Sequence, residues 1–483
     1  MMSNYKRLHP ITAISNFLKE LKQLIAPIII FLFIGRGGHK ESIWEYIPIF
    51  FMMLMILIVL ISGIVKWRRF TYRLEEGELR IEYGLLVKKK RYIPFERIQS
   101  LDLSEGILHR PFGLVKVKIE TAGNSNVTEA EAELTAIKKS EADEIQQIIT
   151  EAKKSSVKIE TNDVTFDVEQ SNEIIYQISN KEMFIMASTS GGAGVIVSAL
   201  LAFISQFNEM IPYEKIFKEL SHLVESGVFL IIFLIVLILL VAWIGSIVVT
   251  LIKYNGFTTK LSDGNFIITR GLLERRQTTI PLHRIQAVRI TENPLRQLWG
   301  YASVFIESAG GSVADKESMN VVLIPIVKKS KIPSILGDVL TDYNFHTSFH
   351  KAPSRAKNRY IIREILKVLP ISAGLAIAFW PIGLLSIILL AFFAVFGLLR
   401  YRAAGWRVEQ DQLSLRYRGL LKHTIFMRKN RIQSMMVKQS WFQRKLHLAS
   451  IFSTVKSSGS RKTSKVYHLE LSDVNRIYQW YRK

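Results

Sequence analysis

The stretch Phe257–Ile290, FTTKLSDGNFIITRGLLERRQTTIPLHRIQAVRI, decides the fold because the chain contains it three times. The first copy starts at Phe70 and reads FTYRLEEGELRIEYGLLVKKKRYIPFERIQSLDL, and the third starts at Gly405 and reads GWRVEQDQLSLRYRGLLKHTIFMRKNRIQSMMV. Every copy contains Gly-Leu-Leu, then a basic segment, then the triplet Arg-Ile-Gln. The glycine precedes the triplet arginine by 13, 13 and 12 residues, at Gly84 and Arg97, Gly271 and Arg284, and Gly419 and Arg431. Similarity at nearly fixed spacing indicates an internal repeat.

Each copy is expected to fold as a small antiparallel domain. Glu76-Gly77 and Asp263-Gly264 are hairpin-turn signals, because glycine tolerates positive φ. Fourteen residues beyond the triplet glutamine stands Gly113, Gly300 or, in the third copy, His447, and another strand follows. Each copy ends in an apolar run and a helix-like stretch, at residues 140–153, 330–341 and 472–482. The pattern predicts about six or seven short strands per copy, in a barrel or bent sheet capped by a helix.

Long apolar stretches precede each copy. A hydrocarbon core ~30 Å thick requires about 20 mostly apolar residues in a helix, and Ile47–Val65 and Gly227–Ile252 carry no charge. Met183–Phe207 is also uncharged, and its Ser190–Gly194 run of small residues favours close helix packing. Ile365–Leu399 is too long for one span, and we divide it at Trp380-Pro381 because proline disfavours helix in the preceding residue. We predict six spanning helices, at residues 21–34, 47–65, 183–207, 227–252, 365–380 and 382–399.

Charge assigns a side of the membrane to the repeated domains. The chain has 64 Lys+Arg against 41 Asp+Glu, a net charge of +23. Basic residues such as Lys66, Arg68 and Arg69 flank the outer ends of the hairpins, whereas the loop at residues 208–226 is acidic on balance and the last hairpin loop is uncharged. The positive-inside rule therefore predicts a multi-pass protein of the cell membrane, with both termini and all three domains in the cytoplasm. The absence of cysteine excludes disulfides, thiolate zinc sites and cysteine nucleophiles, and fits a reducing compartment.

The hairpin-plus-domain unit, the Gly-Leu-Leu turn, the Arg-Ile-Gln strand and the closing helix resemble the bacterial pleckstrin-homology-like (bPH2-type) domains of the YdbT membrane-protein family. The resemblance covers essentially the whole chain, including Arg7-Leu8-His9-Pro10. It implies a PH-like fold of two nearly orthogonal sheets closed by a C-terminal helix, and it implies little about activity. The third copy departs most, because it lacks the turn glycine and has His447 at the second glycine position.

The predicted fold class is membrane α + β: three repeats of a transmembrane helix hairpin followed by a PH-like β-barrel or bent-sheet domain with a C-terminal helix. The hairpins are assigned to residues 1–65, 183–252 and 365–399, and the PH-like domains to residues 66–155, 253–345 and 400–483. Linkers are assigned to residues 156–182 and 346–364. The first linker is acidic, so we expect it to be exposed.

The triplets are the sharpest repeated polar feature, and they have two interpretations. Their arginines and glutamines could contact a peptide, a lipid headgroup or a neighbouring domain: Arg97, Gln99, Arg284, Gln286, Arg431 and Gln433. Alternatively the isoleucines fill the core while the polar members satisfy a turn or an interdomain ion pair, and repetition in every copy favours this structural interpretation. A second set of candidates consists of basic residues that could face an anionic lipid surface: Lys88, Lys89, Lys90, Arg91, Arg275, Arg276, Arg428 and Lys429. The positive-inside bias alone explains these basic residues equally well.

No catalytic, cofactor or metal site is predicted. His346 and His350 have the spacing of metal ligands on a helix, but no third ligand is near them in sequence, so a solvated linker is favoured. The predicted spans lack a carboxylate that would suggest an ion relay, and there is no P-loop, nucleophile elbow or dinucleotide turn. Aromatic residues alternate with basic ones at Trp406-Arg407 and Trp441–Arg444, where a membrane-belt or core role is favoured over nucleic acid binding.

These observations favour a non-enzymatic membrane scaffold. Its cytoplasmic PH-like domains would bind one another, membrane lipids or a partner membrane protein, and the family resemblance suggests a smaller PH-like-domain protein as that partner. The role would lie in envelope maintenance or resistance to membrane-active agents. The alternatives are a transport or export component and a lipid-modifying membrane enzyme. Oligomeric state and helix order are not determined by the sequence.

Overall fold

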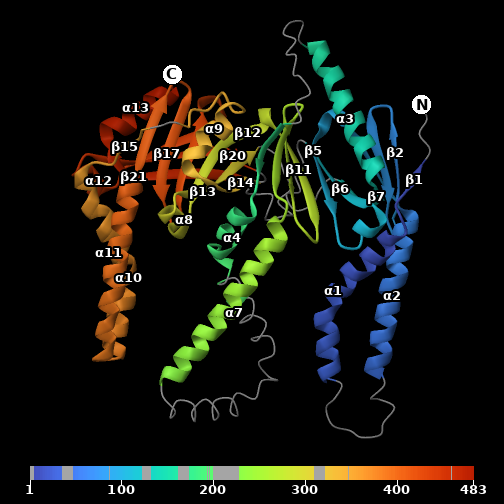
Figure 1. The fold of residues 1–483 in the computed structure, drawn as a ribbon, viewed down its shortest axis with the longest axis horizontal. Coiled ribbons are helices and arrows are strands. Elements are labelled where there is room, and N and C mark those ends of the chain that lie inside the picture. The colour runs from blue at the N-terminus through green and yellow to red at the C-terminus, as the bar shows by residue number, and fades with distance from the viewer. Residues whose placement is uncertain are drawn as a thin grey trace. The chain divides into compact units, whose positions relative to one another are not determined.

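A computed structural model describes residues 5–34, 47–85, 87–121, 132–160, 173–192, 194, 196–198, 228–308, 321–345, 348–457 and 460–482. The chain forms two units (Figure 1). The first comprises residues 1–171 and 273–279, and the second comprises residues 172–272 and 280–483.

The first unit contains one helix hairpin and one domain. Its elements are α1 (Ile11–Ile34), α2 (Ile47–Arg69), β1 (Lys6–Arg7), β2 (Thr71–Glu75), β3 (Glu78–Tyr83), β4 (Lys89–Pro94), β5 (Ile98–Glu105), β6 (Leu114–Thr121), β7 (Ala132–Lys138) and α3 (Lys139–Glu160). Strands β1-β2-β3-β4 form one antiparallel sheet, and β5, β6 and β7 form a second. The two sheets and α3 enclose one core, in which Leu79, Ile119 and Ile145 are buried. This is the arrangement expected of a PH-like domain.

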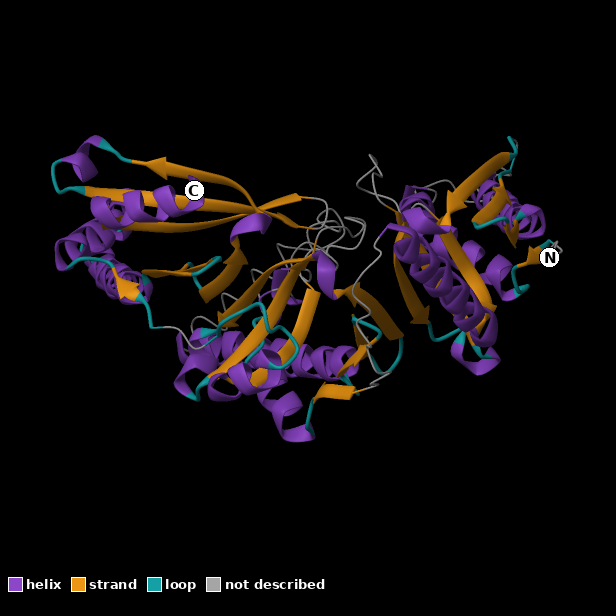
Figure 2. Ribbon diagram, turned by 90° about the horizontal axis from the view of Figure 1, so that it is seen from above, coloured by secondary structure: helices purple, strands orange, loops and turns teal. Residues whose placement is uncertain are grey.

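The second unit contains the second and third copies. The second copy consists of β8 (Glu173–Gln177), α4 (Asn180–Ser188), α7 (Val228–Tyr254), β9 (Thr258–Ser262), β10 (Asn265–Arg270), the end of β11 (Arg275–Pro281), β12 (Ile285–Glu292), α8 (Pro294–Leu298), β13 (Tyr301–Ser308), β14 (Val321–Lys328) and α9 (Ile332–Gly337). The third copy consists of β15 (His350–Lys351), α10 (Lys357–Ala378), α11 (Ser386–Ala403), β16 (Gly405–Glu409), β17 (Gln412–Arg418), β18 (Lys422–Arg428), β19 (Ile432–Lys438), α12 (Trp441–Arg444), β20 (Leu448–Ser457), β21 (Ser460–Glu470) and α13 (Leu471–Arg482). Helix α13 packs on the strands of its own domain (Figure 2).

Short 3-10 helices join the two halves of each domain. In every copy one of them ends at the triplet arginine, and they are η2 (Phe95–Arg97), η4 (Leu282–Arg284) and η8 (Lys429–Arg431). The predicted hairpin turns are confirmed at Gly77 and Gly264, with φ of 77° and 70°. The third copy has a two-residue turn at the same place without glycine: Gln410 has a φ of 46°, like Glu76 and Asp263 at the corresponding position, and Asp411 stands at the glycine position without a positive φ.

Three helices in the described part of the chain are long and apolar enough to span a membrane, namely Ile49–Arg69, Ile235–Tyr254 and Gly383–Ala403. The split at Trp380-Pro381 is confirmed, because α10 ends at Ala378 and α11 begins at Ser386. The other three spans of the predicted six stay a prediction, and residues 199–227 lie outside the described residues.

One predicted helix is not continuous, and another is longer than its predicted span. Helix α1 begins at Ile11 and contains residues 21–34. The continuous helix predicted from residue 183 is interrupted, because α4 ends at Ser188. The hydroxyls that follow bond back to the helix's own carbonyls, Thr189 Oγ1 to Ile185 at 2.6 Å and Ser190 Oγ to Ala187 at 2.9 Å. Close packing of the small residues is confirmed, since a Cβ on Gly192 would lie 2.2 Å from Ser246 Oγ on α7.

The first linker is also more ordered than expected. Helix α3 continues to Glu160, beyond residue 153. Residues Glu173–Gln177 form β8 and pair with β9, and Glu173, Ile174 and Gln177 are exposed as expected. Tyr176 is buried there as part of the apolar core of the second domain. Its hydroxyl donates to the Ile326 carbonyl at 2.6 Å. Residues 161–172 lie outside the described residues.

Candidate interfaces between the repeated domains

Strands of the second and third copies form one continuous sheet in the second unit. Its order is β14-β13-β12-β18-β17-β16-β15. The strand that follows the second triplet, β12, pairs antiparallel with the basic strand β18, from Ala287↔Met427 to Glu292↔Lys422. Every residue of β12 is buried. Phe426 of the third copy lies in the core of the second, and Ala287 of the second lies in the core of the third, so the copies share their cores.

A partly buried ion pair closes this junction between the second and third copies. Lys422 Nζ lies 3.1 Å from Glu292, and their side chains are 12% and 5% exposed. Lys329 of the second copy lies 3.1 Å from the same carboxylate. Burial by itself would raise the pKa of Glu292, but Lys422 and Lys329 outweigh it and hold that pKa below its usual range. Glu292 is therefore charged at neutral pH and ties the two copies together.

A second ion pair lies deeper in the junction. Arg289 Nε lies 2.8 Å from Glu307, and their side chains are 7% and 0% exposed. Ser457 of the third copy donates to the other oxygen of Glu307 at 2.8 Å. Sequence reasoning missed this pair: Arg289 interrupts an apolar strand, but nothing in the sequence connects it to Glu307. A buried charge requires such a partner, so the third copy helps to satisfy a charge inside the second.

The third triplet reaches the second copy. Arg431 Nη2 donates to the His283 carbonyl at 2.8 Å, next to the second triplet. Gln286 is buried and its Nε2 donates to the Arg284 carbonyl at 3.0 Å, whereas Gln433 is exposed on β19. Arg284 is half-buried. The structure therefore brings the second and third triplets together at the junction.

The first triplet lies in the first unit. Arg97 is exposed at the end of η2, and the side chain of Gln99 lies outside the described residues. The predicted core role of the isoleucines is confirmed, because Ile98, Ile285 and Ile432 are 1%, 3% and 6% exposed.

The basic candidates fall into two groups. Lys88, Lys89 and Lys90 are exposed on or beside β4, with Arg91 half-buried after them, and Lys88 and Lys90 lie 2.6 and 3.4 Å from Glu82. The others lie at contacts within the protein. Arg428 lies 2.7 Å from Asp342, Lys429 Nζ lies 5.8 Å from the Trp480 ring centre, and Arg276 lies 3.0 Å from Glu274. Arg275 is exposed and faces Glu105 across a strand pair.

That strand pair repeats the junction inside the first unit. Residues 275–278 pair antiparallel with β5, from Arg275↔Glu105 to Thr278↔Asp102. The register equals that of β12 and β18, because Arg275 and Lys422 each stand nine residues before their triplet arginine. Glu105 and Glu292 each stand seven residues after their triplet isoleucine. Both junctions therefore place a basic residue opposite the same glutamate position, an arrangement that favours antiparallel pairing.

Two strands that correspond to the junction strands β18 and β12 lie at sheet edges. Strand β4 ends the sheet β1-β2-β3-β4, and β19 ends the sheet β19-β20-β21. Neither has a strand on its other side within the described ranges. Met436 and Val437 on β19 are 52% and 37% exposed, unlike their buried counterparts on β12. We call β4 and β19 the open edges.

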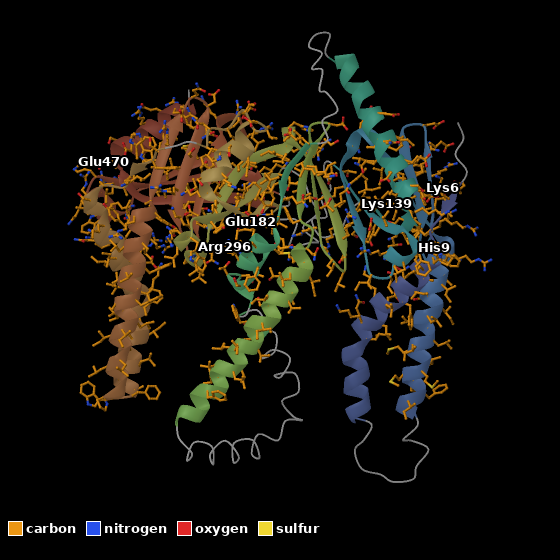
Figure 3. The ribbon with its side chains drawn as sticks, in the orientation of Figure 1. Lys6, His9, Lys139, Glu182, Arg296 and Glu470 are labelled. Carbon is orange, nitrogen blue, oxygen red and sulfur yellow. The ribbon has the colours of Figure 1, made fainter. Side chains whose placement is uncertain are left out.

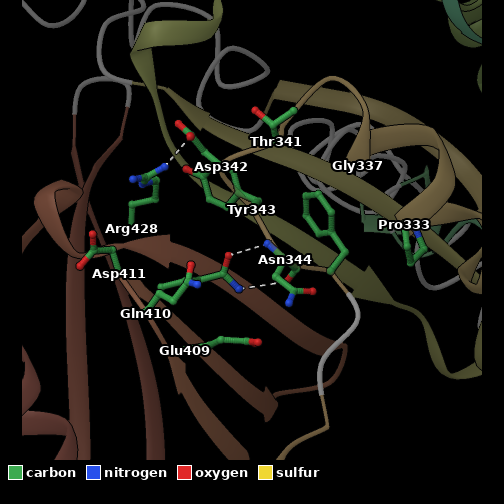
Figure 4. Close-up of a pocket in the computed structure, with 12 residues that line it drawn as sticks. Pro333, Gly337, Thr341, Asp342, Tyr343, Asn344, Glu409, Gln410, Asp411 and Arg428 are labelled. Carbon is green, nitrogen blue, oxygen red and sulfur yellow. Dashed lines mark hydrogen bonds and ion pairs between the residues drawn. The ribbon is translucent and has the colours of Figure 1, made fainter.

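A polar cavity of about 520 Å³ lies where the second and third copies meet (Figure 4). Asp342 and Asn344 of the second copy line it, together with Gln412 and Arg428 of the third. Gln412 exchanges two hydrogen bonds of 2.9 Å with the Asn344 backbone. In the part of the chain that is described, no three His, Asp or Glu side chains gather as a metal site. His350 is exposed and stacks on Trp406, and His346 lies outside the described residues.

The junction is expected to weaken in acid. His423 Nδ1 lies 3.1 Å from Thr291 Oγ1 across the β12–β18 pair, and burial lowers its pKa to about 4, with Arg289 and Lys462 adding to the effect. The folded state keeps His423 neutral while the unfolded chain is protonated below about pH 6.5, so stability falls as the pH drops from about 6.5 to 4. We expect a loss of roughly 3 kcal/mol, measured by hydrogen exchange of the β18 amides. The variant His423→Gln should lose most of this dependence, and an unchanged dependence would contradict the assignment.

Comparison with known proteins gives three matches to one domain family. The model of the bacterial PH domain family matches residues 24–153, 211–340 and 364–483. The UPF0699 transmembrane protein YdbT of Bacillus subtilis (strain 168) is 38% identical over 489 residues, which cover 100% of this chain and 99% of YdbT. The UPF0699 transmembrane protein YdbS of the same strain is 30% identical over 95 residues, or 20% of this chain and 56% of YdbS.

Proposed function

The chain belongs to the bacterial PH domain family of transmembrane proteins, and from this premise we propose that it is a membrane-anchored scaffold whose PH-like domains assemble edge to edge. The hairpins hold the domains at the cytoplasmic face of the cell membrane. The function consists of binding other membrane proteins, and it requires no catalytic step.

The observation that carries the proposal is the β12–β18 junction. The second and third copies, each of which has one residue in the other's core, join through one antiparallel strand pair, and the Lys422–Glu292 ion pair fixes the register. The pairing of residues 275–278 with β5 repeats this arrangement in the first unit. Strand addition at a sheet edge is a general mode of recognition, because main-chain hydrogen bonds supply affinity and side chains supply specificity. The same chemistry is available at the open edges.

The partner at an open edge would be a PH-like domain of a different chain. In a contact between two copies of this chain, the register of the internal junctions would place Lys89 of β4 opposite Lys438 of β19. It would also place Lys88 opposite Gln439, where the internal junctions have a glutamate. Like charges directly opposite destabilise a strand pair. A partner for β4 should therefore carry an acidic residue at this position. A smaller PH-like-domain membrane protein, of the kind represented by YdbS, suits this role.

Photo-crosslinking in intact cells tests the proposal. A benzoylphenylalanine replaces Met436 on β19 or Tyr92 on β4, which are 52% and 54% exposed, and Tyr478 on α13, 44% exposed, is the matched control. We expect adducts from the two edge positions with a membrane protein that contains a PH-like domain, identified by mass spectrometry. The control should give none. Equal labelling from all three positions, no adduct from either edge, or an adduct only with chains lacking such a domain would each overturn the proposal.

A further inference from the structure

Large apolar side chains are exposed in corresponding loops of all three copies. These loops, here called the aromatic loops, precede the sixth strand of each domain and comprise residues 106–113, 293–300 and 439–447. They expose Ile107, Phe112, Leu298, Trp299, Trp441 and Phe442. Solitary exposed hydrophobic residues are ordinary, but a group repeated at one place in three domains indicates an interaction surface.

In the second copy, hydrogen bonds connect the aromatic loop to residues that lie beside the end of a candidate membrane span. Arg296 on α8, labelled in Figure 3, donates from Nε to Thr189 Oγ1 at 2.9 Å. The next residue, Ser190, lies 3.3 Å from Thr250 Oγ1. Thr250 lies within the candidate span Ile235–Tyr254, about one helical turn from its end. Helix α8 is therefore placed where the span leaves the membrane.

The third copy repeats this placement with different contacts. The Arg359 guanidinium on α10 lies over the ring of Phe442, 5.3 Å from its centre. Two residues further along α10, the Ile361 Cα would lie 2.7 Å from a Cβ on Gly397. Gly397 belongs to the candidate span Gly383–Ala403. The aromatic loop of the third copy thus lies beside the end of its own span.

In the first copy, which belongs to the other unit, the aromatic loop also lies beside the end of a span. The His9 ring lies 6.0 Å from the Phe112 ring (Figure 3 labels His9). The preceding residue, Leu8, accepts a hydrogen bond of 2.8 Å from Trp67 Nε1. Trp67 lies within the candidate span Ile49–Arg69.

The Gly-Leu-Leu loops flank the hairpins on the other side. These loops comprise residues 84–87, 271–273 and 419–421. Each loop, or the residue before it, is hydrogen-bonded to the last turns of the second helix of its hairpin: Leu272 N to Ile252 O at 2.9 Å, Arg400 Nε to Arg418 O at 2.9 Å, and Arg69 Nη1 to Leu85 O. These loops also expose apolar side chains, since Val87, Leu272 and Leu420 are 70%, 44% and 73% exposed. Each domain therefore presents two apolar loops, one beside the first helix and one beside the second.

We propose that the aromatic loops and the Gly-Leu-Leu loops insert into the interfacial zone of the lipid bilayer and fix each PH-like domain against the membrane. Tryptophan and phenylalanine beside leucine suit this zone, where an apolar body meets the headgroups. Exposed basic residues next to the Gly-Leu-Leu loop of the first copy, Lys88 and Lys89, add attraction to anionic lipid. Burial of apolar surface holds the loops in place, so the insertion persists at high salt. It is independent of which partner occupies the open edges.

Spin-label depth measurement tests this insertion in the full-length protein in proteoliposomes of phosphatidylglycerol and phosphatidylethanolamine. The chain has no cysteine, so Leu298→Cys and Leu420→Cys each give one labelling site. Both positions are already exposed, and replacement leaves the core intact. The control is Asn475→Cys, exposed on α13, which lies away from the α10–α11 hairpin within its unit (Figure 1).

We expect labels at 298 and 420 to collide severalfold more with oxygen than with a water-soluble nickel chelate, relative to the label at 475. The difference should persist in about 1 M salt, where the Debye length is ~3 Å. Water-like collision rates at 298 and 420 would overturn the proposal. A difference that disappears in high salt would also overturn it, because electrostatic adsorption without insertion would then account for the position of the loops.

Discussion

The variant Arg289→Met is expected to destabilise the second unit by about 3–5 kcal/mol. The substitution leaves the Glu307 carboxylate in a fully buried position, and within the described ranges the Ser457 hydroxyl is then its one side-chain partner. An uncompensated buried charge costs much more than the pair contributes, because the desolvation penalty is no longer offset. Hydrogen exchange of the β13 amides, followed in mild detergent, measures the loss.

Two companion variants separate this effect from a general loss of packing. The double variant Arg289→Met/Glu307→Leu removes both charges and should recover most of the stability. Arg407 forms a half-exposed pair with Glu409 at 3.1 Å in the same unit, and Arg407→Met should cost about 1 kcal/mol or less. If Arg289→Met costs no more than Arg407→Met, the buried pair does not hold the junction together.

The domain plan could be predicted from the sequence because it depends on local signals. Gly77 and Gly264 mark turns whose φ is positive, Trp380-Pro381 marks a helix boundary, and the triplet isoleucines occupy core positions. Each of these signals involves residues that are neighbours in the chain. The interruption after Ser188 was missed because hydropathy does not register hydroxyls that bond back to the helix.

The junctions could not be predicted in the same way. Residues 287–292 pair with residues 422–427, and alternation along a strand tells which face is buried but not which strand becomes its neighbour. A signal was nevertheless present, since a glutamate follows the first and second triplet isoleucines by seven residues and a basic residue precedes each triplet arginine by nine. The triplet arginines also differ in their surroundings, which the shared motif does not predict. Arg431 lies at the junction of the second and third copies, whereas Arg97 stands next to the open edge β4.

The second large expected effect is increased self-association of the protein through its open edges. In the variant Lys438→Thr/Gln439→Glu, β19 acquires the residues that β12 has at Thr291 and Glu292. Two cross-strand pairs of up to about 1 kcal/mol each should tighten self-association by up to about thirtyfold. The contact is head-to-tail, so it leaves an open edge at each end and builds chains rather than closed dimers. Mass photometry of the purified protein should show multiples of the wild-type mass.

This explanation requires that the carboxylate introduced at position 439 pairs with Lys88 beside β4. Lys88→Glu, placed in the same background, sets two carboxylates opposite each other and should return the assemblies to the wild-type mass. Arg407→Glu changes the charge of the chain equally but lies on β16, which is not one of the open edges, and should leave the assemblies intact. An unchanged mass for the gain-of-assembly variant would show that the charges at this position do not select the partner. Assemblies that survive Lys88→Glu would show that β19 pairs with a strand other than β4. The wild-type residues Lys438 and Gln439 are thus expected to keep the edge of one chain from pairing with the next and leave it free for a different PH-like domain.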